Sequence, residues 1–178
     1  SEGKAFYDDL KSRAAAHGRN PDHVKIMPGF MSIIGETQNE ADQLAGELQA
    51  MMDDATAMRL LARLCGDLDI FAYPIDGPLP DLPPSNAAKA RQEHLMAKAK
   101  AENLSIRQVA RYLGTSLGHQ LVVGTAQSIA DKMQEWLEAG ACDGFTLLFP
   151  FYTKPLDDFV RLVVPELQRR GLFRTAYP

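Results

Sequence analysis

Two short stretches of the sequence carry polar groups that could do chemistry. His119 precedes a β-prone run, and an imidazole titrates near neutral pH, so it could donate a hydrogen bond to an anionic group; a structural histidine bonded to the backbone is the alternative. Gly124 and Thr125 open a helical pattern, where backbone N–H groups could hold a phosphate, although an ordinary N-cap explains the same residues. The sequence contains no acid–base pair, nucleophile triad, metal-ligand cluster or GxGxxG motif. It therefore predicts no catalytic residue and no metal site within the chain.

Pro28 and Gly29 interrupt the apolar run 24–34, which is the first predicted strand. Proline cannot donate to the hydrogen-bond ladder of a central strand, so this pair marks either a bulge or the end of the strand. Because glycine has no Cβ, a bulge here would let the backbone approach a bound ligand closely. A bulge that only relieves strand curvature is the alternative.

Two segments rich in aromatic residues and proline are predicted to border a pocket. Phe149 ends the last predicted strand and begins the sequence F-P-F-Y, so it could form an aromatic wall, with packing in the core as the alternative. Residues 66–84 hold five prolines among apolar residues, which excludes regular helix or strand but is too apolar for a plain linker. We predict an ordered excursion that acts as a lid or substrate-specificity segment through Tyr73 and Asp76. An oligomer contact is the rival interpretation.

Hydrophobic periodicity predicts strands that alternate with helices. The predicted strands are 24–34, 120–123 and 143–149, and the predicted helices are 2–17, 37–51, 53–64, 86–102, 104–113, 126–139 and 156–170. Such alternation is typical of βαβ units with parallel pairing, so the sequence predicts an α/β fold. Gly114 is predicted to end one helix, and Pro165 to kink or break another.

The composition excludes several classes of protein. With 46% hydrophobic and 24% charged residues, the chain is neither disordered nor fibrous, and its net charge of −4 argues against a nucleic-acid binder. No run approaches 18 consecutive apolar residues, so no membrane span is predicted. Two cysteines are too few for a disulfide scaffold, which favours a reduced, cytoplasmic protein. A (β/α)8 barrel takes about 250 residues, so 178 residues make either a small atypical α/β domain or part of a larger barrel.

Three short motifs follow one another in the last third of the chain: V-G-T at 123–125, E-A-G at 138–140 and D-G-F at 143–145. In this order they resemble the bacterial-luciferase-like FMN-dependent monooxygenases. The stretches Y-P-I-D-G-P at 73–78, D-D-F-V-R-L-V-V-P-E-L-Q-R-R-G at 157–171 and A-F-Y-D-D-L at 5–10 resemble the nitrilotriacetate and dibenzothiophene-sulfone monooxygenase branch. The resemblance implies that residues 1–178 are a single partial domain, the C-terminal part of a TIM (β/α)8 barrel. The excursion would be a lid-like insertion within it.

The resemblance also implies a chemistry for the whole enzyme. Members of the family use reduced FMN, supplied by a separate NADH:FMN reductase, and O2 to oxidise a small organic substrate; the flavin carries the reaction. Pro28, Gly29, His119 and Phe149 are then the residues predicted to contact the flavin. The flavin phosphate site would lie upstream of residue 1, so this chain alone is predicted to be inactive. The open strand edges of a partial barrel further predict a homo-oligomer.

Two alternatives belong to other classes of function. The chain could be a stand-alone partial barrel that works as a binding or assembly module without catalysis. Residues 104–116 could instead be the first helix and turn of a DNA-binding helix-turn-helix, with Arg107 and Arg111 on phosphates. The strand-like residues that follow, and the net charge of −4, argue against that second alternative.

Overall fold

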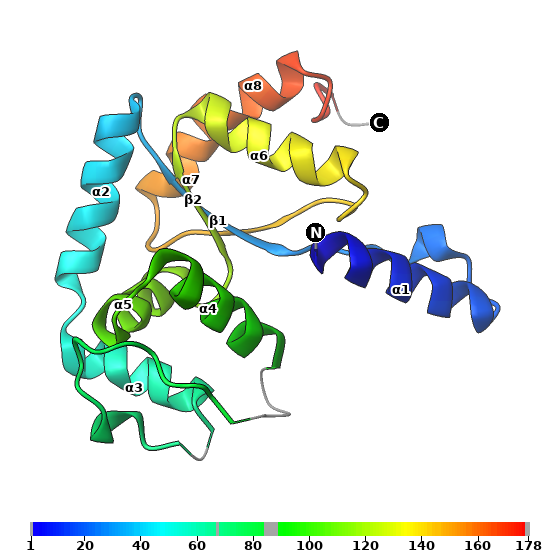
Figure 1. Ribbon diagram of the computed structural model, residues 1–178. Coiled ribbons are helices and arrows are strands. Elements are labelled where there is room, and N and C mark those ends of the chain that lie inside the picture. The colour runs from blue at the N-terminus through cyan, green and yellow to red at the C-terminus, as the bar shows by residue number, and fades with distance from the viewer. Residues whose placement is uncertain (1, 67, 84–88, 177–178) are drawn as a thin grey trace. The chain divides into compact units, whose positions relative to one another are not determined.

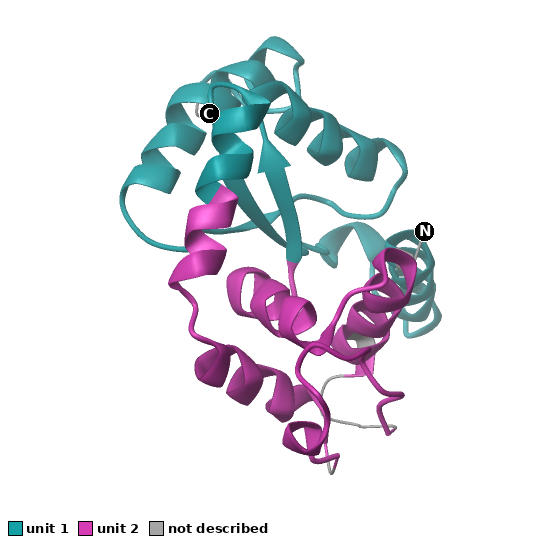
Figure 2. Cartoon of the chain, turned by 60° about the vertical axis from the view of Figure 1, so that its left-hand side comes forward, with its two compact units in different colours: residues 1–44, 120–178 teal, residues 45–119 magenta. Residues whose placement is uncertain are grey.

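The computed structural model describes residues 2–66, 68–83 and 89–176, which fall into two compact units (Figure 2). Unit 1 comprises residues 1–44 and 120–178, and unit 2 comprises residues 45–119. Residues 67 and 84 of the predicted excursion, and residues 86–88 of a predicted helix, lie outside the described residues.

Unit 1 is built on a three-stranded parallel sheet in the order β2-β1-β3. The strands are β1 (Gly29–Ile34), β2 (Gln120–Gly124) and β3 (Thr146–Leu148). Phe30 pairs with Gln120 and Ile34 with Gly124, while Gly29 pairs with Thr146. The predicted α/β fold with parallel strands is confirmed, although β1 and β3 are shorter than their apolar runs.

Helices cover one face of this sheet (Figure 1). They are α6 (Ala126–Glu138), the single π-helical turn η3 (Phe159–Val163) and α8 (Val164–Arg169). Alternate residues of β1 face them, because successive side chains of a strand point to opposite sides. The buried core of this layer consists of Phe30, Ile34, Ile129, Ala130, Met133, Phe159, Val163 and Leu167.

The predicted break at Pro165 is present as a change of helix type. The helix α7 (Lys154–Asp158) passes into η3, where the Val164 N–H donates to the Phe159 carbonyl oxygen, and α8 resumes with Pro165 in its first turn. Proline has no N–H and its ring clashes with the preceding turn of an α-helix, so a wider turn just before it relieves the clash.

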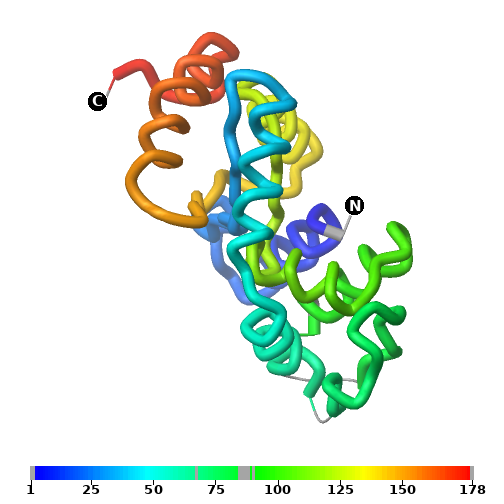
Figure 3. Tube along the Cα trace, turned by 90° about the vertical axis from the view of Figure 1, so that its left-hand side faces the viewer, coloured from blue at the N-terminus to red at the C-terminus, as the bar shows by residue number. Residues whose placement is uncertain are grey.

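After β1 the chain reverses direction into α2 (Gln38–Met51), as Figures 1 and 3 show. Thr37 caps this helix: its Oγ1 accepts from the Glu40 N–H at 3.2 Å, and the Glu40 carboxylate accepts from the N–H of the preceding residue, Glu36, at 2.9 Å. Gly35 makes the reversal possible, because a Cβ on it would lie 2.4 Å from the backbone nitrogen of Ala41.

The N-terminal helix α1 (Glu2–Ala16) is tied to the turn before β3. The Asp143 carboxylate accepts hydrogen bonds from Tyr7 Oη at 3.0 Å and Lys11 Nζ at 3.3 Å. Lys11 also donates to the carbonyl oxygens of Pro21, in the short helix η1 (Pro21–His23), and of Val24. These bonds order the chain that leads into β1.

Unit 2 is helical. It contains α3 (Asp54–Leu64), the 3-10 turn η2 (Ile70–Ala72), α4 (Lys89–Glu102) and α5 (Ile106–Ser116). Asp53 caps α3 by accepting from the Thr56 N–H at 2.9 Å, as expected for an acidic residue at a helix start. The buried core of unit 2 consists of Ala57, Met58, Leu61, Cys65, Ile70, Leu95, Ala99, Ile106, Val109, Ala110 and Leu113.

Two predictions about α5 are wrong. Gly114 does not end the helix, which continues to Ser116; the space beside the glycine is taken by Met52, whose sulfur lies 2.3 Å from the position of an added Cβ. The helix-turn-helix alternative also fails, because strand β2 follows α5 where a recognition helix would be needed. Arg107 and Arg111 pair with Asp54.

The described part of the Pro-rich excursion is held by unit 2 itself. The Ile106 N–H donates to the Gly77 carbonyl oxygen and the Arg107 N–H to that of Ile75, both at 2.8 Å. Ile70 is fully buried in the core of the unit. Apart from the 3-10 turn η2, the described part of the excursion is therefore ordered by backbone hydrogen bonds at the start of α5.

Candidate functional site

The carboxyl ends of the three parallel strands define one edge of the sheet as a candidate ligand site, called the candidate edge below. Ile34, Gly124 and Leu148 are the last residues of β1, β2 and β3, and parallel pairing brings these ends to the same side of the sheet. In barrels of alternating strands and helices, and in open parallel sheets, ligands bind at this edge.

At this edge the Gly124–Thr125 turn is filled by its own neighbours. A Cβ on Gly124 would lie 2.3 Å from Ser128 Oγ and 3.0 Å from Gln38 Oε1. Gly124 accepts a hydrogen bond from the Gly35 N–H at 3.1 Å, and Thr125 Oγ1 accepts from the Ser128 N–H at 3.4 Å. The turn thus has the arrangement of the ordinary N-cap that was the alternative to a phosphate site.

Phe149 directly follows β3, and its ring packs inward. It belongs to the partly buried residues around the core of the helical layer, with its centroid 6.0 Å from that of Phe159 and 6.2 Å from that of Tyr152. Core packing was the alternative to an aromatic wall, and the contacts favour it. In the same segment Phe151 and Tyr152 are exposed, Tyr152 by 71%.

Pro28 and Gly29 lie at the opposite end of the sheet. β1 begins at Gly29, and the Pro28 carbonyl oxygen accepts from the Thr146 N–H at 3.0 Å. The expected bulge is therefore absent, and the proline marks the boundary at which the strand begins, where it costs the ladder no donor. This places the pair at the amino ends of the strands, away from the candidate edge.

Asp158 lies near the start of the helical stretch 154–169. It is the last residue of α7, is 8% exposed, and binds Lys154 and Arg161. Burial opposes its charged form, but the hydrogen bonds from both cations outweigh that effect and hold the pKa of Asp158 below its usual value. Arg161 also approaches Glu36 at 3.7 Å, which links η3 to the turn after β1.

The two predicted lid residues have different surroundings. The Asp76 carboxylate forms an ion pair with the Arg107 guanidinium at 2.8 Å, so it is engaged by the fold. The Tyr73 side chain is 39% exposed and is free to meet a ligand or another chain. The role of both residues as a lid stays a prediction.

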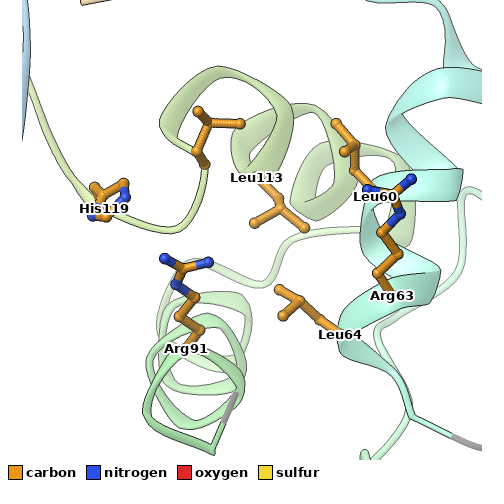
Figure 4. A pocket seen from close by; sticks show the side chains of 7 residues that line it. Leu60, Arg63, Leu64, Arg91, Leu113 and His119 are labelled. Carbon is orange, nitrogen blue, oxygen red and sulfur yellow. The ribbon is translucent and has the colours of Figure 1, made fainter. Parts of the chain in front are cut away.

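His119 lines a pocket within unit 2 of about 340 Å³ (Figure 4). The lining residues are Leu60, Arg63, Leu64, Arg91, Leu113, Leu117 and His119. Burial lowers the pKa of His119, and the positive charge of Arg91 lowers it further; both effects favour the neutral imidazole. Sequence reasoning missed Arg63 and Arg91, because each looks like a solvent-facing charge on its own helix.

Among the described residues, no cluster of three or more metal-ligating side chains occurs, and no helix is long and apolar enough to cross a bilayer. The chain thus combines an α/β unit built on parallel strands with a helical unit that holds a pocket. Its sequence pattern from residue 1 to residue 143 matches that of the luciferase-like monooxygenases. The chain belongs to this family.

Three related proteins match this chain over nearly its whole length. The chain is 41% identical over 174 residues to N-acetyl-S-(2-succino)cysteine monooxygenase of Bacillus subtilis, covering 97% of this chain and 40% of that protein. It is 39% identical to nitrilotriacetate monooxygenase component A of Aminobacter aminovorans (99% and 39% covered) and 34% identical to dibenzothiophene-sulfone monooxygenase of Rhodococcus erythropolis (98% and 39%). The resemblance to the last two enzymes is confirmed. The chain spans about two fifths of the length of the curated relatives it matches.

A solved structure agrees with this assignment. EDTA monooxygenase from Chelativorans sp. BNC1 superposes with a TM-score of 0.67 at 31% identity, covering 99% of this chain and 41% of that one. The three-stranded parallel sheet described above is therefore part of the fold of luciferase-like monooxygenases.

Proposed function

We propose that this chain is the C-terminal part of a monooxygenase that uses reduced FMN and O2 to oxidise a small organic molecule. The observation that carries the proposal is the match of nearly the whole chain to about two fifths of several monooxygenases. The parallel βα units of unit 1 support the proposal, because their three strands are fewer than the eight that a complete barrel contains.

The described residues do not form a flavin site by themselves. The space beside Gly124 is occupied by Ser128 and Gln38, and the Phe149 ring is packed against Phe159. We therefore derive no chemical step from this chain alone, and we propose that it is inactive without the remainder of a barrel. For Pro28, Gly29, His119 and Phe149 the contact with flavin stays a prediction.

We further propose the partners that such an enzyme requires. A separate NADH:FMN reductase would supply the reduced flavin, and both proteins would work in the cytoplasm. The component A named in one relative supports a system of more than one protein. Self-association into a homo-oligomer is part of the same proposal, because β2 and β3 each have one edge unpaired in the described sheet.

Anaerobic titration with reduced and oxidised FMN tests the proposal. We expect the natural gene product to bind reduced FMN more tightly than oxidised FMN, and the isolated 178-residue chain to bind neither. Absence of flavin binding by the natural gene product would overturn the monooxygenase assignment and favour the alternative of a binding or assembly module. Flavin binding by the isolated chain would overturn its proposed inactivity.

A further inference from the structure

The pocket beside His119 combines positive charge with an apolar lining. Arg63, Arg91 and the imidazole supply the polar groups, and no acidic side chain is among the described residues that line it. The rest of the lining is leucine: Leu60, Leu64, Leu113 and Leu117. We propose that this pocket binds a small organic anion, with its carboxylate head on Arg91 and its apolar body on the leucines. The inference concerns the pocket alone and stands independently of the flavin chemistry proposed above.

The two arginines of the pocket differ from the other arginines of unit 2. Arg59 donates to Thr56 Oγ1 at 2.9 Å, and Arg107 and Arg111 both pair with Asp54. Arg63 and Arg91 form no side-chain hydrogen bond or ion pair with any residue that the structure describes. A guanidinium whose donors no described side chain engages offers them to a ligand, and it binds planar anions in a bidentate manner.

A tight turn holds His119 at the pocket. Leu117 and Gly118 are both left-handed, with φ of 51° and 75°. The Ser116 hydroxyl accepts from the Gly118 N–H at 3.2 Å, and the Ser116 carbonyl oxygen accepts from the His119 N–H at 2.9 Å. A Cβ on Gly118 would lie 3.2 Å from Cδ of Arg91, so the Arg91 stem would have to shift slightly, and the positive φ itself favours glycine. Figure 4 shows the Arg91 guanidinium reaching toward the space between His119 and Leu113.

The size and lining of the pocket limit the ligand. A volume of about 340 Å³ is at the lower end of the range for small-molecule sites. Leu117 is 50% exposed although its side chain lines the pocket, so a ligand with an apolar body would remove part of that surface from water. An inorganic ion would leave the leucines uncovered, whereas an aliphatic or aromatic acid covers them.

Calorimetric titration of the natural gene product with hexanoate tests the site. Hexanoate carries a carboxylate on a short apolar chain, and hexanamide has nearly the same shape without the charge. We expect saturable binding of one hexanoate per chain, and binding of hexanamide weaker by about ten-fold or more, because a hydrogen bond to a charged group contributes about 1.5 to 3 kcal/mol. Equal binding of the two compounds, or no saturable binding of hexanoate, would overturn the proposal.

Matched variants distinguish a specific effect of the pocket arginines from a general effect of net charge on hexanoate binding. Arg91→Gln is expected to weaken hexanoate binding by about ten-fold. Arg63→Gln is expected to weaken it less, because its guanidinium lies on the other side of the leucines. Arg59→Gln on α3 and Lys89→Gln on α4 remove the same charge from the same helices outside the pocket, and less than about a two-fold change is expected. An equal loss in all four variants would contradict the site. Reduced FMN titrated into the same variants distinguishes failure of this site from failure of the flavin proposal.

Discussion

Asp143 and Ile26 exchange two hydrogen bonds across 117 positions of sequence. The Asp143 N–H donates to the Ile26 carbonyl oxygen at 2.9 Å, and the Ile26 N–H donates to Asp143 Oδ2 at 2.8 Å. The same carboxylate binds Lys11 at 3.1 Å, and its side chain is only 14% exposed. The D-G-F motif, one of the sequence signals of the family, therefore lies immediately before β3 and fixes the approach to β1.

Asp143→Asn is expected to destabilise the protein by about 2 kcal/mol, because it replaces a buried charge that accepts several hydrogen bonds. Urea unfolding monitored by circular dichroism measures this loss. Asp8→Asn is the control, since Asp8 pairs with Lys4 in an exposed i, i+4 arrangement that contributes little. Equal losses in the two variants would contradict the role given to Asp143.

The contribution of Asp143 depends on pH in a defined direction. Burial alone would raise its pKa, but the hydrogen bonds from the Ile26 N–H, Lys11 and Tyr7 outweigh burial and hold the pKa of Asp143 below its usual value. The stabilisation is present above the unfolded pKa of about 4 and is lost as the pH falls through the lower folded value. We expect the gap in unfolding free energy between wild type and Asp143→Asn to be wide at about pH 6 and narrow near about pH 2.5. A gap of constant size would contradict this assignment.

Two glycine substitutions near α2 are expected to have opposite effects. Gly35→Ala places a Cβ 2.4 Å from a backbone nitrogen, which cannot move aside, so we expect marked destabilisation. Gly46→Ala lies inside α2 with no atom within 4 Å of the new Cβ, and we expect stabilisation of about 0.5 to 1 kcal/mol. Thermal unfolding of both variants checks this pair. A neutral Gly35→Ala would mean that the turn after β1 is not as tight as described.

Cys65 is expected to react slowly with thiol reagents. It is fully buried, and burial raises the pKa of its thiol to about 11, so very little thiolate is present at about pH 8. When native protein is treated with an aromatic disulfide reagent, Cys65 is expected to react only as the protein unfolds. In urea-denatured protein it is expected to react at once. Rapid reaction of Cys65 in the native state would contradict the core of unit 2.

The sequence was most informative where a local rule decides the structure. Capping residues such as Thr37 and Asp53, the break before Pro165 and the parallel βα order follow from patterns a few residues long. The prediction that Gly114 ends a helix was wrong, because its neighbour Met52 comes from a distant part of the chain. Only that contact explains a glycine inside α5.

The candidate site was harder to predict because it depends on contacts between distant segments. His119 was singled out by its chemistry, but Arg63 and Arg91 join it only once α3, α4 and the turn after α5 come together. Pro28 and Phe149 both border strands, yet the sequence pattern could not tell which end of the sheet or which face of the strand they occupy.

The intact mass of the natural gene product tests the central claim most directly. If this chain is the C-terminal part of a luciferase-like monooxygenase, mass spectrometry of that product will give more than twice 19.6 kDa, as the coverage of the relatives implies. A natural mass of 19.6 kDa would contradict the claim and identify a stand-alone partial barrel that binds or assembles without catalysis.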